Sequence, residues 1–204
     1  MFQGCKTLTR IPEIKNATEV TNSSGMFYNC EKLTDVYPSL HMPASTNMDN
    51  LFRNCLSLVD APSTLTMTSV TSATEMFRDC TRLENAPRTI QAPVIKNMQL
   101  MFYNCTALRV APVSISAEMV TNAYQLFYNC TNLTSPPTVI NIPRATHIYE
   151  MFINCRFMET CTTDIVAPAA THVYGLFNGC LSLKTIRDEY SFPEGIQCYN
   201  IFYN

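Results

Sequence analysis

Charge and glycine are both scarce in this 204-residue sequence, and each scarcity excludes a class of function. Charged residues form only 15% of the chain, whereas the hydrophobic fraction of 47% is ordinary, so the composition predicts a folded protein rather than a disordered one. The net charge of −2, with no cluster of Lys or Arg, offers no electrostatic partner to nucleic acid or to an anionic membrane. With only five glycines, the chain has no Gly-rich phosphate loop.

Long apolar runs and catalytic motifs are missing as well. No segment approaches the roughly 18 apolar residues that a membrane span requires, and the N-terminal MFQGCKTLTR lacks the apolar segment of a secretion signal. The sequence contains neither a G-x-S-x-G elbow nor an H-E-x-x-H motif. We therefore predict that this chain is not an enzyme, holds no cofactor and does not insert into a membrane.

What the chain does contain is a motif that returns at a fixed spacing. The sequence MFYNC occupies residues 26–30 and 101–105, and the same Phe and Cys recur every 25 residues. The phenylalanines of this set are Phe2, Phe27, Phe52, Phe77, Phe102, Phe127, Phe152, Phe177 and Phe202, and the cysteines are Cys5, Cys30, Cys55, Cys80, Cys105, Cys130, Cys155 and Cys180. A constant period of this size is typical of repeat proteins, in which neighbouring units bury each other's apolar faces.

Within one unit the spacing changes from helical to extended. In residues 97–105, Met98, Met101, Phe102 and Cys105 stand at i, i+3, i+4 and i+7, the pattern of one apolar helical face. After the Cys, apolar residues stand three apart and a Pro follows, which indicates an extended segment that bends. We therefore predict an α+β repeat fold, a leucine-rich-repeat-type solenoid of eight 25-residue coils, each with short strands and a short helix.

The register continues without insertion from Phe2 to Phe202, so we predict one solenoid domain over residues 1–204. The chain stops inside a further unit, and a solenoid needs polar caps on its terminal coils. We therefore expect the sequence to be a fragment of a longer protein.

The repeated unit resembles a known family of surface-protein repeats. The unit is similar to the BspA-like leucine-rich repeats in the sequence MFYNCTALRVAP at residues 101–112 and in its counterparts. The segments that lead into the motif, VTNSSGMF at residues 20–27 and IKNMQLMF at residues 95–102, are similar to that family as well. The sequence departs from that pattern in its 25-residue period, in its Ala-Pro bends and in the unit at residues 157–165. The resemblance implies a solenoid on a bacterial or protist cell surface that adheres to host proteins or to other cells.

The ten cysteines permit either a disulfide framework or a set of free thiols. All ten stand where other units carry an apolar residue, and side chains from stacked coils should point the same way, which is poor disulfide geometry. We predict free, buried thiols. No Cys-x-x-Cys pair is present, so we expect no zinc site. His147 and His172 should stack in successive units, either as a metal pair or pH switch or as replacements for a capping Asn.

Tyrosine and arginine gather in two columns that flank the buried Phe. The candidate ligand-binding residues are Tyr103, Tyr124, Tyr128, Tyr149, Tyr174, Tyr199, Arg53 and Arg78. Tyr and Arg are the residues that most often anchor interfaces, and a contiguous exposed aromatic patch usually has a partner. The alternative is that stacked tyrosines only cover the seams between coils.

The outward side of the strand that follows the Phe–Cys motif is a second candidate surface. Its residues differ from unit to unit and include Thr9, Arg10, Thr34, Asp35, Val59, Asp60, Glu84, Asn85, Arg109, Val110, Glu159, Thr160, Lys184 and Thr185. Such variation suits ligand recognition, but unconstrained solvent positions vary too.

Two functions remain open. The first is a non-enzymatic, extracellular adhesion or recognition module that binds a protein or glycan of a host or neighbouring cell. The second is an architectural spacer, or a component of a surface assembly or virion, with no ligand of its own.

Overall fold

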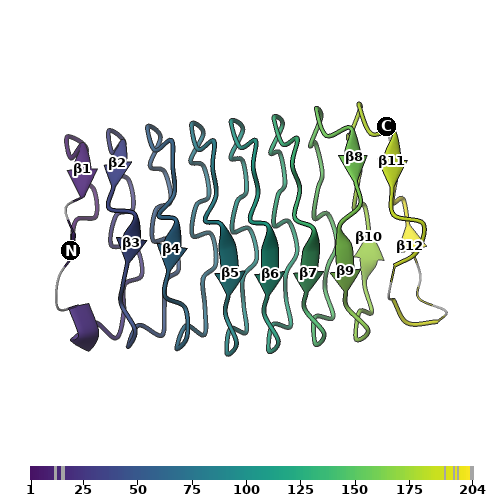
Figure 1. Ribbon diagram of the computed structural model, residues 1–204, viewed down its shortest axis with the longest axis horizontal. Coiled ribbons are helices and arrows are strands. Elements are labelled where there is room, and N and C mark those ends of the chain that lie inside the picture. The colour runs from purple at the N-terminus through teal and green to yellow at the C-terminus, as the bar shows by residue number, and fades with distance from the viewer. Residues whose placement is uncertain (12, 15–16, 191, 195, 197, 203–204) are drawn as a thin grey trace.

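The computed structural model describes residues 1–11, 13–14, 17–190, 192–194, 196 and 198–202, and its coils follow one another in a single row (Figure 1). Paired strands are parallel and 25 residues apart, as in the register Ile90↔Ile115↔Ile140↔Ile165. The predicted solenoid with a 25-residue period is therefore confirmed, but the chain forms a β-solenoid of about seven turns rather than the eight coils expected.

The strands form three ladders along the row, with isolated bridges where the strands are interrupted. The first ladder contains β1 (Arg10–Ile11), β2 (Asp35–Val36), β8 (Thr160–Cys161) and β11 (Thr185–Ile186), with bridges through Asp60, Asn85, Val110 and Ser135. The second contains β3 (Ser39–Leu40), β4 (Thr64–Leu65), β5 (Thr89–Gln91), β6 (Ser114–Ser116), β7 (Val139–Asn141) and β9 (Asp164–Val166). The third contains β10 (Val173–Tyr174) and β12 (Cys198–Tyr199), preceded by bridges from Asn22 to His172.

The predicted short helix of each unit is wrong. The described ranges contain no α-helix, and the helical element among them is the 3-10 helix η1 (Ala17–Glu19). In the unit at residues 97–105, the amide of Phe102 donates to the Leu126 carbonyl in the next coil at 2.9 Å, and the amide of Tyr103 donates to the Leu100 carbonyl at 3.1 Å. Because alternate amides bond to the next coil, the i to i−4 pattern of a helix cannot form. The fold is all-β rather than α+β.

Left-handed residues turn the chain in place of that helix. Leu100 and Asn104 have φ angles of 58° and 61°, and the corresponding residues of other coils also have positive φ. Asn occupies the second of these positions in most coils because it tolerates the left-handed conformation. Each segment between the third ladder and the Cys is therefore a pair of successive turns.

The predicted phenylalanine column forms the centre of the core. Consecutive rings from Phe2 to Phe202 lie nearly parallel, with centroids 5.3 to 5.8 Å apart. Rings from Phe27 to Phe177 are buried, whereas Phe202 is 56% exposed. The Leu, Ile and Met columns pack around this stack, so each coil buries apolar area against both neighbours.

The cysteines form a second inward column, and the thiols from Cys30 to Cys180 are buried and free. Each described thiol of the periodic column from Cys30 to Cys180 donates to the carbonyl of the Phe in the preceding coil, as from Cys105 Sγ to Phe77 O at 3.1 Å, whereas the Cys161 thiol lies 3.3 Å from the Thr163 hydroxyl. Burial raises the pKa of Cys80 from its usual 9.0 to about 12. Cys5 departs from the prediction because it is exposed, and the side chain of Cys198 lies outside the described residues.

Candidate functional site

The first predicted tyrosine column is a ladder of stacked rings beside the third strand ladder. Tyr124 and Tyr149 have centroids 4.9 Å apart, and Tyr149 and Tyr174 have centroids 4.6 Å apart, with nearly parallel planes. Tyr199 continues the column in the backbone of β12, where it pairs with Tyr174, but its side chain is not among those described. The structure therefore brings these residues together as the sequence predicted.

Stacking changes what this column offers to a ligand. Tyr124 and Tyr149 are half-buried, and Tyr174 is 37% exposed, because each ring covers the face of its neighbour. Partial burial raises the pKa of Tyr149, and the adjacent tyrosines and Glu150 raise it further. The column presents ring edges and hydroxyls to solvent rather than ring faces, which limits its use as an aromatic platform.

The second predicted column contains Arg53, Arg78, Tyr103 and Tyr128, whose rings and guanidinium groups contact neighbouring side chains, although the buried Arg53 Nε has no hydrogen-bond partner among the described residues. Tyr103 and Tyr128 stack with centroids 4.8 Å apart, and the Arg78 guanidinium lies over the Tyr103 ring at 4.8 Å. Both arginines pair with the half-buried carboxylate of Glu75. Because the guanidinium charges and ring faces are already engaged within the chain, this column has little free binding capacity.

The two histidines stack as predicted, with ring centroids 4.6 Å apart. Nδ1 of each ring lies 2.9 Å from the hydroxyl of the preceding residue, Thr146 or Thr171. In the same column Asn47 Oδ1 accepts a hydrogen bond from the amide of Asp49 at 2.7 Å, so this position caps a turn rather than a helix. Within the described ranges no group of three potential metal-binding side chains occurs.

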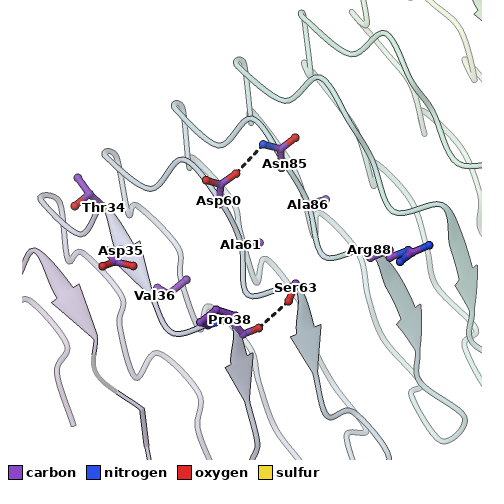
Figure 2. A pocket seen from close by; sticks show the side chains of 10 residues that line it. All are labelled: Thr34, Asp35, Val36, Pro38, Asp60, Ala61, Ser63, Asn85, Ala86 and Arg88. Carbon is purple, nitrogen blue, oxygen red and sulfur yellow. Dashed lines mark hydrogen bonds between the residues drawn. The ribbon is translucent and has the colours of Figure 1, made fainter.

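The second predicted surface, the outward side of the first ladder, carries a furrow across three coils (Figure 2). The hollow has a volume of about 440 Å³ and is lined by Thr34, Asp35, Val36, Pro38, Asp60, Ala61, Ser63, Asn85, Ala86 and Arg88. The side chains at its base are small and apolar, because two of the coils have an Ala, Ala61 or Ala86, directly before a Pro. Asp60 accepts a hydrogen bond from Asn85 Nδ2 at 2.7 Å, and the Arg10 guanidinium lies 3.1 Å from Asp35.

Two further hollows lie on this same side, toward the C-terminal coils. One, of about 580 Å³, is lined by residues 185–189 and Thr162. The other, of about 410 Å³, is lined by Arg109, Asn132, Thr134, Phe157 and Glu159. The sequence pattern had marked Arg109 and Glu159 as surface positions but had missed Phe157. Phe157 could have been noticed in the sequence because it stands outside the 25-residue series of phenylalanines.

No helix in the described part of the chain is long and apolar enough to cross a bilayer. The three hollows described above are each lined by residues of two or more coils.

Comparison with known proteins identifies the repeat. A leucine-rich cell surface protein from Faecalibacterium prausnitzii A2-165 aligns with a TM-score of 0.35 and 17% identity, over 93% of this chain and 75% of that one. A search of curated proteins finds no match. A family model described as "Mycoplasma protein of unknown function, DUF285" matches residues 1–115, 46–164 and 89–190. The resemblance to the BspA-like repeats is confirmed. Because these matches cover most of the sequence, the chain belongs to the DUF285 family.

Proposed function

We propose that this chain is a non-enzymatic recognition module of a cell-surface protein, which binds a protein or glycan on a host or neighbouring cell. The BspA-like character of the repeats supports the surface location. The outward side of the first ladder is the binding surface, whereas the Tyr and Arg columns stabilise the solenoid.

The observation that carries this proposal is the furrow of Figure 2. It is a continuous hollow across three coils, and its walls hold charged, hydroxyl and amide side chains above a small apolar floor. Concave sites with a few polar groups over an apolar surface are the usual form of binding sites. Asp60, Asn85 and Arg88 are exposed in this furrow and are therefore within reach of a partner.

A charge-reversal experiment tests the proposal. Beads coated with the full chain are applied to cultured epithelial cells, and retention is compared with that of beads carrying Asp60→Lys together with Arg88→Glu. We expect retention to fall about tenfold or more, because each exposed furrow side chain would meet its partner with the wrong charge. The matched control is Glu118→Lys with Arg144→Glu, which also exchanges one exposed acid and one exposed base but lies outside the furrow.

Retention that survives the furrow variant, with circular dichroism unchanged in all samples, would contradict the proposal. The triple change of Tyr124, Tyr149 and Tyr174 to Ser separates the two surfaces. We expect it to lower the melting temperature, since it removes two stacked contacts, and to leave retention unchanged at temperatures where the variant is folded.

The architectural alternative has an observation in its favour. Ladders of side chains from successive coils bond to one another, as in the contact from Asn129 Nδ2 to Asn104 Oδ1 at 2.7 Å. A chain whose surface side chains hydrogen-bond to one another in this way can serve as a rigid spacer. Equal, low retention of the wild-type chain and every variant would favour this alternative.

A further inference from the structure

Phe157 is an aromatic side chain that the fold does not need. Nine of the eleven phenylalanines belong to the periodic column, and Phe157 does not. Its ring is 58% exposed. The equivalent residues of other coils are small or polar, namely Lys32, Ser57, Arg82, Ala107, Asn132 and Ser182. Single exposed apolar side chains are common on protein surfaces, so a binding role for Phe157 depends on the groups that surround its ring.

The ring of Phe157 lines a hollow of about 410 Å³ together with Arg109, Asn132, Thr134 and Glu159. These residues come from three successive coils. In contrast to the stacked tyrosines, Phe157 has no ring contact with any other described residue. Phe157 can therefore offer a free ring face to a ligand.

Two of the polar groups around this ring have no side-chain partner within the described part of the chain. Among the described residues, none pairs with the Arg109 guanidinium or with the Asn132 side-chain amide. Glu159 lies 3.0 Å from Lys184 Nζ, and both side chains are well exposed. That pair is neutral as a unit, and Arg109 is the cation of the hollow's lining that has no ion-pair partner among the described residues.

We infer that this hollow binds a pyranose ring that carries a carboxylate, as in the acidic sugars of cell-surface glycans. The apolar C–H face of the sugar packs on Phe157, and the carboxylate binds the Arg109 guanidinium in a charge-assisted, bidentate contact. The Asn132 amide and the Glu159 carboxylate bind ring hydroxyls. This inference deepens the proposed function and rests on it, since it assigns one ligand class to one site on the recognition surface.

Other polymers fit the site less well. A nucleic acid would bring many phosphates to a surface where Arg109 is the one unpaired cation of the hollow. An apolar peptide anchor needs an enclosing pocket, whereas this hollow is shallow and walled by polar side chains. A single aromatic platform beside a cation, an amide and a carboxylate suits a small ring with one apolar face and one charge.

Saturation-transfer NMR on the full chain tests the inference. The probes are the methyl glycosides of galacturonate, glucuronate and N-acetylneuraminate, and each is compared with a neutral methyl galactoside under the same conditions. We expect at least one acidic glycoside to bind in the millimolar range and several-fold more tightly than the neutral sugar. We expect Phe157→Ser to weaken its binding about tenfold, and Phe157→Tyr to retain it. Arg109→Gln should remove the preference for the acidic sugar.

The controls separate the site from the fold. Leu181→Ser removes another exposed apolar side chain, 65% exposed, from a neighbouring coil and should leave sugar binding unchanged. Phe157→Ser should also leave the melting temperature unchanged because the ring is exposed. The inference is overturned if none of the acidic glycosides binds, or if binding is insensitive to Phe157→Ser.

Failure of this inference and failure of the proposed function give different results. Cell retention that depends on Asp60 and Arg88, without sugar binding, would overturn the sugar site and leave the recognition surface intact. Sugar binding that depends on Phe157, without any retention on cells, would support the site and contradict the function in adhesion.

Discussion

Each phenylalanine of the central column contributes both its ring and its carbonyl group. The Phe102 ring stacks between Phe77 and Phe127 with centroids 5.3 Å away on both sides. The Phe102 carbonyl accepts the amide of Cys105 in its own coil at 3.2 Å and the thiol of Cys130 in the next coil at 3.2 Å. One residue thus joins three coils, which explains why the Phe and Cys recur together.

Truncation of one ring should therefore be costly. We expect Phe102→Ala to lower the free energy of unfolding by about 3 to 5 kcal/mol, since it removes a fully buried aromatic side chain and leaves a cavity. Urea denaturation followed by circular dichroism measures this. Phe157→Ala is the matched control, and its cost should be near zero because that ring is exposed. Equal costs for the two variants would contradict the assigned core.

At the scale of the structural element, the paired turns replace the helix that the apolar spacing suggested. Asn104, Asn129 and Asn154 have φ angles near 60°, and the Asn129 side chain bonds to Asn104 at 2.7 Å. Asparagine therefore has two roles at this turn: it tolerates the left-handed backbone, and its amide links neighbouring coils.

Substitutions at Asn129 separate these two roles. Asn129→Gly keeps the backbone conformation and loses the side-chain contact, so we expect a cost of about 0.5 to 1.5 kcal/mol. Asn129→Ala also introduces a Cβ into the left-handed conformation, which adds roughly 1 to 2 kcal/mol. Thermal or urea unfolding of both variants checks the order. An Ala variant as stable as the Gly variant would mean that the turn can change its conformation.

At the scale of the whole molecule, the buried thiols make stability depend on pH. The pKa of Cys80 is about 12 in the folded chain and near its usual 9.0 when unfolded, and burial raises the pKa of Cys55, Cys105, Cys130 and Cys155 as well. Because the folded pKa values are raised, the thiols contribute fully to stability below pH 9.0. That contribution is lost as the pH rises toward 12.

Alkaline unfolding tests this dependence. The shift at Cys80 alone corresponds to a loss of about 4 kcal/mol by pH 12, so we expect the melting temperature to be level below pH 9 and to fall steeply above it. Cys80→Ala should show a shallower fall, since one titrating group has been removed, although its melting temperature at neutral pH is lower. Identical slopes for the two proteins would contradict a buried, titrating thiol ladder.

Much of the candidate surface could be predicted, because a fixed period determines which residues become neighbours. The sequence placed Tyr124, Tyr149 and Tyr174 in one column and His147 above His172, and the structure stacks both sets. Periodicity did not reveal that Glu75 neutralises Arg53 and Arg78. Nor did it reveal that Phe157 lines a hollow, since these contacts depend on rotamers and on distances between columns.

The amino-acid sequence by itself determined the 25-residue register and the inward position of Phe and Cys, because a repeated apolar slot has to face the interior of a stack. Only the tertiary structure decided between a helix and paired turns. Apolar residues at i, i+3, i+4 and i+7 face one way in both conformations, and the choice depends on whether an amide bonds four residues back or to the next coil. In residues 97–105 the neighbouring coil supplies those acceptors, as Leu126 does for Phe102, and a single unit of the sequence does not contain them.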